Sequence, residues 1–174
     1  MVPTPRQFLH RWLAPLRSDA QPRSLAQALG SGVSATLGLL ALHALTVASG
    51  QPLLIGPLGA SAVLVFAAPE AQLSQPRNLV GGHAISALVA ACTVAALGST
   101  PYTIALAVGL ATFAMMLTRT LHPPGGATAL IGVQGTCGFS FVLVPVLASA
   151  PVLLATALVT NNLGRQRRYP THWL

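Results

Sequence analysis

The chain has 174 residues, of which 53% are hydrophobic and only 6% are charged. Soluble domains carry about 25% charged residues, so this composition argues against a soluble enzyme, a nucleic-acid-binding domain and a disordered tail. All nine basic residues are arginine, and only two acidic residues oppose them, which gives a formal net charge of +7. Such an apolar chain is predicted to be an integral membrane protein.

The few charges are concentrated near the two termini. Between them the chain has three long stretches without Asp, Glu, Lys or Arg, namely residues 24–69, 78–118 and 120–164. Each is long enough for a transmembrane helix of about 20 residues. We therefore expect an Arg-rich cytoplasmic or interfacial segment (residues 1–24), a transmembrane domain (25–162) and a basic cytoplasmic tail (163–174). For residues 1–24, the sequence leaves a short interfacial helix and a frayed tail as alternatives.

The apolar stretches divide into six segments. Long spans are predicted at residues 25–47, 78–98, 102–118 and 139–160. Two shorter segments, residues 52–68 and 122–134, are apolar but interrupted by glycine and proline. Together they predict an all-α fold, a polytopic bundle of transmembrane helices.

The two short segments resemble each other. Residues 57–66 align without gaps on residues 124–133, with four identical positions at an offset of 67. Each half of the domain reads long span, interrupted short segment, long span. We therefore predict two three-segment repeats, about 25–98 and 99–162, each with one short broken helix. Paired interrupted segments in two halves indicate the binding site of a transporter.

The arginines favour one topology. If all six segments cross, both termini and the loops that carry Arg77 and Arg119 lie on one side, as the positive-inside rule prefers. Repeats with an odd number of crossings are then inverted relative to each other. If the short segments dip in and return instead, four spans remain and Arg77 and Arg119 lie outside. We favour six crossings.

The segment from His122 to Ala129 is the most distinctive in the chain. Proline is favoured at the first helical position, and the residue before it is pushed into extended backbone, so a helix is expected to begin at Pro123 with His122 at its mouth. Gly125 and Gly126 allow close approach. Within a membrane the positive amino end of such a helix favours an anion. The segment 57–61 offers the same elements, with Ser61 in place of Thr128.

Other polar residues are candidates for the same site. Arg77, beside Asn78, is either an anion-attracting cation or an interfacial anchor. His83 is either a hydrogen-bonded packing residue or a pore residue. Arg119 either shares a site with His122 or anchors the chain at the interface.

These motifs carry a resemblance to a known family. The run His-Pro-Pro-Gly-Gly-Ala-Thr-Ala-Leu (122–130), with Gly-Ala-Ser-Ala (59–62), Gln-Pro-Arg-Asn (75–78) and Gly-Gly-His (81–83), resembles the HPP family of small membrane proteins. The resemblance covers about residues 25–162. It implies a multi-pass protein, for which four transmembrane helices are the usual description. Some relatives are associated with nitrite transport into plastids, and others carry an extra regulatory domain.

The sequence therefore predicts a transporter or channel for a small inorganic anion, with nitrite as the leading candidate. A ligand-binding sensor or assembly module and a pore for a small neutral solute are the alternatives. Carboxylate pairs, metal-ligand clusters and a P-loop are missing from the sequence, so we expect no enzyme, cofactor or metal site.

The expected partners are the anion, the lipid bilayer and further copies of the chain, a dimer being favoured, and nucleic acid is not expected. The expected location is a bacterial plasma membrane with both termini cytoplasmic. The predicted substrate-binding residues are His122, Pro123, Pro124, Gly125, Gly126, Thr128, Gly59, Ser61, Arg77, Asn78, His83 and Arg119.

Overall fold

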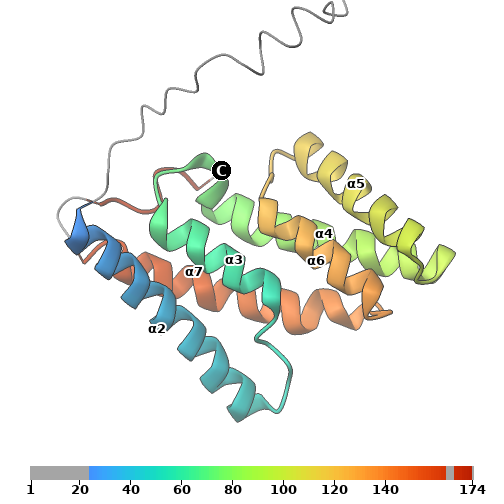
Figure 1. Cartoon of the computed structure of the whole chain (residues 1–174), viewed down its shortest axis with the longest axis horizontal. Coiled ribbons are helices and arrows are strands. Elements are labelled where there is room, and N and C mark those ends of the chain that lie inside the picture. Colours follow the sequence, from blue (N-terminus) through green and yellow to red (C-terminus); the bar gives the residue numbers. More distant parts are fainter. Residues whose placement is uncertain (1–23, 164–166, 174) are drawn as a thin grey trace, which may run out of the picture.

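The computed structural model of the chain describes residues 24–163 and 167–173. Within these residues the chain forms six α-helices, one 3₁₀ turn and one π-helical segment, without a β-strand (Figure 1). The predicted all-α fold class is confirmed. Most of the predicted N-terminal segment, residues 1–23, lies outside the described part. The elements are α2 (Leu25–Ser49), α3 (Gly56–Ala67), η1 (Gln72–Ser74), α4 (Pro76–Leu97), α5 (Pro101–Leu117), α6 (Pro123–Gln134), η2 (Val142–Leu147) and α7 (Ala148–Thr160).

Proline and capping residues set the helix boundaries. Helices α3, α4, α5 and α6 each have proline in the first two positions, where the missing N–H has no intrahelical partner to lose. Helices α2 and α5 begin with capping boxes, formed by Ser24 with Gln27 and by Thr100 with Thr103. In these boxes the two side chains satisfy backbone N–H groups of the first turn. The helix starts are therefore encoded locally in the sequence.

Three helical segments are long and apolar enough to cross a membrane, namely Leu25–Ser49, Pro76–Leu97 and Val142–Thr160. They agree closely with three of the predicted long spans. The fourth, α5, is apolar with 17 residues. The last span is less regular than the pattern predicted, because Val144 has non-helical backbone and Pro145 follows it inside η2. Proline removes a helical hydrogen bond, so this span is kinked near its start.

The helices pack in two groups. Helices α4, α5 and α6 contact one another, and α2 contacts both α3 and α7. Thus the third helix of each predicted half packs on the first two helices of the other half. The short helices α3 and α6 begin near the centre of the molecule and run in opposite directions (Figure 1). This arrangement is what an inverted repeat would produce, although the repeat itself stays a prediction.

One end of the molecule gathers several helix ends and the C-terminal tail. The guanidinium of Arg167 donates to the carbonyls of Gln27 in α2 and Phe66 in α3. Tyr169 is buried, and its hydroxyl donates to the carbonyl of Ser74 at 2.8 Å. Burial raises the pKa of this hydroxyl, so it stays protonated as the donor. The backbone N–H of Thr171 donates to the side chain of Gln75. The loop before α4 and the C-terminal tail therefore lie at the same end of the bundle.

Candidate functional site

His122 occupies the position predicted for it at the mouth of α6. It is the N-cap residue, with extended backbone (φ −140°, ψ 102°), and its side chain is fully buried. The extended conformation follows from the prolines after it. Its Nδ1 atom lies 2.8 Å from the carbonyl oxygen of Leu73. Because a carbonyl can only accept, Nδ1 carries the proton and donates.

Ser61 joins this histidine to a second one. Its Oγ atom, on α3, lies 2.8 Å from Nε2 of His122 and 2.7 Å from Nε2 of His83 on α4. The two imidazole rings meet edge to face, with their centroids 5.0 Å apart. Ser61 and both histidines have no solvent-exposed surface. Three segments distant in sequence thus meet at one buried hydroxyl.

Thr128 on α6 completes the cluster. Its Oγ1 atom lies 2.7 Å from Nδ1 of His83, and its side chain is also fully buried. The residues that the alignment of the two short segments pairs, Ser61 and Thr128, therefore bind the two nitrogens of one imidazole. We call Ser61, His83, His122 and Thr128 the histidine cluster.

The hydrogen-bond directions in the histidine cluster follow from its Leu73 end. In a neutral imidazole one nitrogen donates and the other accepts. With the proton of His122 on Nδ1, its Nε2 accepts from the hydroxyl of Ser61 at 2.8 Å, the shorter of the two contacts open to that proton, since the Pro57 carbonyl lies at 3.2 Å. Ser61 in turn accepts from Nε2–H of His83. Nδ1 of His83 then accepts from the hydroxyl of Thr128. With both imidazoles neutral, each hydrogen bond in the cluster has one donor and one acceptor. The bonds form a chain in which Thr128 donates to His83, and so on through Ser61 and His122 to the Leu73 carbonyl.

Close backbone packing holds the cluster together. A Cβ atom added at Gly82 of α4 would lie 2.5 Å from Cβ of His122, and one added at Gly125 of α6 would lie 3.0 Å from the carbonyl oxygen of Gly82. Side chains at these positions would separate α4 from α6. Small residues allow such contact between membrane helices. Gly125 therefore packs against α4, in accordance with the close approach predicted for it.

Arg77 and Asn78 hold the chain segment that leads into α6. The guanidinium of Arg77 donates to the carbonyl of Thr118 at 2.7 Å, and the amide of Asn78 donates to the carbonyl of Leu121 at 2.8 Å. Asn78 is buried and Arg77 is half-buried. Both predicted site residues thus fix residues 118–121, which lead directly into His122, beside the start of α4.

The remaining predicted residues lie at or beyond the margin of the cluster. Pro124 is buried, Pro123 is exposed, and Gly59 and Gly126 are half-buried. Arg119 is exposed, with left-handed backbone (φ 57°) at the end of α5. In residues 24–163 and 167–173 no hydrogen bond joins Arg119 to His122, so the structure does not bring these two residues into one cluster. Among the same residues, no group of three His, Cys, Asp or Glu is placed to hold a metal ion.

Two contributors escaped the sequence analysis. The carbonyl of Leu73 orients His122, but a backbone acceptor leaves no trace in the sequence. Gln75 is fully buried and its amide donates to the carbonyls of Pro69 and Ala71, which shapes the turn carrying Leu73. The sequence offered one signal for Gln75, namely that it is the first residue of the Gln-Pro-Arg-Asn run that resembles the family.

A family model described as the HPP transmembrane region matches residues 20–170 of the chain. The chain belongs to the HPP transmembrane family. Two transmembrane proteins of Dictyostelium discoideum are similar to this HPP protein. One is 40% identical over 183 residues, covering 96% of the chain and 57% of the relative, and the other is 39% identical over 180 residues, covering 96% and 63%. This HPP protein thus spans about 60% of the length of these curated relatives. No solved structure is significantly similar to it.

Proposed function

We propose that this HPP protein is a transporter or channel for a small inorganic anion, with nitrite as the first substrate to test, and that the anion passes the histidine cluster. The observation that carries the proposal is the complete burial of two histidines at the convergence of α3 and α6. Ionisable residues inside a membrane domain are costly and mark substrate or proton pathways.

The direction of the short helices supports an anion as the substrate. Ser61 lies in the first half of α3 and His122 caps the start of α6, so the amino ends of both helices approach the cluster. Amino ends of helices favour negative charge, and broken membrane helices hold anionic substrates in this way. In the described arrangement the side chains of the cluster fill this space, so an entering anion must displace the bond between Ser61 and His122.

Protonation of His122 would reverse the direction of that bond and add a charge that attracts the anion. Its Nδ1 proton is engaged by the Leu73 carbonyl, so an additional proton binds at Nε2, the atom that accepts from Ser61. The resulting imidazolium donates at Nε2 instead of accepting, so the hydroxyl of Ser61 must turn its own proton toward the Pro57 carbonyl, 3.2 Å away, and the imidazolium provides a positive charge beside the helix amino ends. We therefore propose that the anion and one proton move together.

The test is uptake of nitrite into proteoliposomes under an imposed pH gradient. We expect faster uptake than in empty vesicles, accelerated by an acidic exterior. The substitution His122→Ala should reduce uptake by roughly tenfold or more, since removing a buried hydrogen-bond partner costs about 1–3 kcal/mol. His43→Ala is the control, because His43 is an exposed histidine on α2 outside the cluster. Uptake equal to that of empty vesicles would refute transport of nitrite.

The same vesicles separate the alternatives. Flux of a neutral solute would respond neither to the pH gradient nor to the membrane potential. Flux of the anion with one proton would respond to the pH gradient, and flux of an anion without a proton would respond to the potential. Binding of nitrite without accumulation would instead indicate a sensor or an assembly module. We also propose that the protein acts as a homo-oligomer, most simply a dimer, because a chain of 17.8 kDa is small for enclosing a pathway alone.

A further inference from the structure

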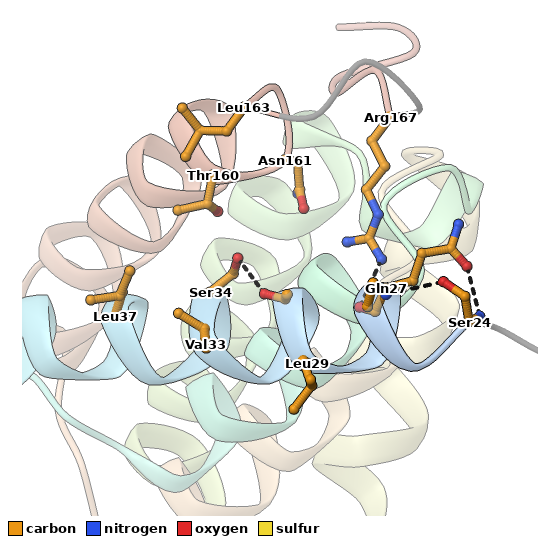
Figure 2. A pocket seen from close by; sticks show the side chains of 12 residues that line it. Ser24, Gln27, Leu29, Val33, Ser34, Leu37, Thr160, Asn161, Leu163 and Arg167 are labelled. Carbon is orange, nitrogen blue, oxygen red and sulfur yellow. Dashed lines mark hydrogen bonds between the residues drawn. The ribbon is translucent and has the colours of Figure 1, made fainter.

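A groove separates the first turns of α2 from the end of α7. Its volume is about 860 Å³, and α2 lines it with Leu29, Gly30, Val33 and Leu37. The other wall comes from the end of α7 and the C-terminal tail, with Asn161 and Arg167 (Figure 2). The groove is therefore apolar along α2 and polar at one end, and it lies apart from the histidine cluster.

The polar end of the groove presents a cation. The guanidinium of Arg167 contacts three neutral oxygens, those of the Phe66 and Gln27 carbonyls and the Ser31 hydroxyl, at 3.0–3.3 Å. None of these partners is a carboxylate. Figure 2 shows the side chain reaching down toward Gln27 at the head of the groove. Its positive charge is thus held in place beside the groove and is available to an anionic group.

Asn161 supplies a second, independent observation. Its side chain is 1% exposed and its Nδ2 donates to the carbonyl of Val65, but its buried Oδ1 has no hydrogen-bond partner among residues 24–163 and 167–173. Because Val65 offers an acceptor, the amide cannot be turned to satisfy Oδ1 without losing the existing bond. Figure 2 shows the amide pointing from α7 toward α2. A buried acceptor without a partner costs about 1–3 kcal/mol, and a ligand with a hydroxyl donor would recover this free energy.

The dimensions of the groove match one lipid leaflet. From Gln27 beside Arg167 to Leu37, ten residues of helix rise about 15 Å, which is half of a hydrocarbon core about 30 Å thick. Helix α2 is among the candidate membrane spans, and 17% of its most apolar window is buried inside the protein. The rest of that window lies at the surface of the protein. The polar end lies at the first turn of this span, where lipid headgroups are found.

We infer that this groove binds one phosphatidylglycerol molecule. Its phosphate contacts Arg167, a hydroxyl of its glycerol headgroup donates to Oδ1 of Asn161, and one acyl chain lies along Val33 and Leu37. An anionic lipid with a hydroxylated headgroup fits both polar residues. Phosphatidylcholine has no such donor, and the ammonium group of phosphatidylethanolamine would lie close to a guanidinium of the same sign.

Native mass spectrometry of the purified chain, with each phospholipid added in turn, tests the assignment. We expect one phosphatidylglycerol to be retained in preference to phosphatidylcholine and phosphatidylethanolamine. Arg167→Gln should lower its retention roughly fivefold or more, in keeping with one basic residue near a headgroup. Arg168→Gln is the matched control, because Arg168 is the exposed arginine next in sequence and does not line the groove.

A second pair of variants keeps the test valid if Arg167→Gln fails to fold. A Cβ atom at Gly30 or at Gly32 meets no atom within 4 Å, but only Gly30 lines the groove. Gly30→Leu should abolish retention and Gly32→Leu should leave it unchanged. Equal retention of all three lipids, or equal loss in both members of either pair, would overturn the proposal. A change from oligomer to monomer in Gly30→Leu, without loss of bound lipid, would also overturn it and assign the groove to a second copy of the chain.

Discussion

No apolar residue could replace Ser61 without a loss of stability. Its hydroxyl serves both imidazoles at once, accepting from Nε2–H of His83 and donating to Nε2 of His122. All three side chains are removed from solvent, so water cannot take over these bonds. The cluster is therefore a fully satisfied polar network, in which the loss of one member leaves others unpaired.

Replacement of Ser61 by alanine is expected to destabilise the protein. Two buried imidazole nitrogens would lose their partner, and each unpaired group costs about 1–3 kcal/mol. The midpoint of thermal unfolding in detergent should fall clearly. Ser86→Ala is the comparison, because Ser86 is equally buried but its hydroxyl bonds the sulfur of Met115, a weak acceptor, at 3.7 Å. Equal midpoints for the two variants would show that the hydrogen bonds of Ser61 to the two imidazoles do not stabilise the protein.

At the scale of elements, the contact between α4 and α6 positions the site. Gly82 faces His122 and the carbonyl of Thr120, so the backbone of α4 touches the segment that leads into α6. Arg77 and Asn78 bind the same segment from the start of α4. Helix α4 thus holds the start of α6 in place.

A methyl group at Gly82 should disturb the contact between α4 and the start of α6. In Gly82→Ala the new Cβ would meet Cβ of His122 at 2.5 Å and the carbonyl oxygen of Thr120 at 2.9 Å. Overpacking of this kind costs about 1–3 kcal/mol. The reference variant is Gly109→Ala on α5, where the added Cβ meets nothing within 4 Å and alanine should stabilise the helix by about 0.5–1 kcal/mol. The two variants should shift the thermal midpoint in opposite directions, and a stabilised Gly82→Ala would contradict the packing described.

At the scale of the whole molecule, the described contacts bear on the number of crossings. The C-terminal tail binds Ser74 and Gln75 in the loop before α4, so these segments share one end of the bundle. This agrees with six crossings, in which the short helices complete their passage with extended chain. With four crossings the loop before α4 would lie on the other side of the membrane from the C-terminus.

Labelling of single cysteines tests the six-crossing topology. In a variant in which Cys92 and Cys137 are replaced by alanine, we introduce Gln72→Cys, Ser99→Cys or His172→Cys, all at exposed positions. A membrane-impermeant maleimide should label positions 72 and 172 from the same side and position 99 from the opposite side. Labelling of position 99, instead of 72, from the side of position 172 would establish four crossings.

The sequence by itself determined the membrane class, the family and the positions of the spans. Low charge and long apolar stretches are composition effects, and proline and glycine mark helix ends locally, so these features needed no tertiary information. His122 at the mouth of a helix was predicted from the prolines after it for the same reason.

Only the tertiary structure decided which polar residues meet. Ser61 lies 22 residues from His83 and 61 from His122, and hydrophobic periodicity reports that a face is buried without naming its partner. Arg119 is three positions from His122, yet the left-handed turn at the end of α5 leaves it exposed. The unpaired oxygen of Asn161 and the groove beside it depend likewise on how α7 packs against α2. Local signals fix where helices begin, but long-range packing selects the hydrogen-bond partners, because only close contact removes polar groups from water and lipid.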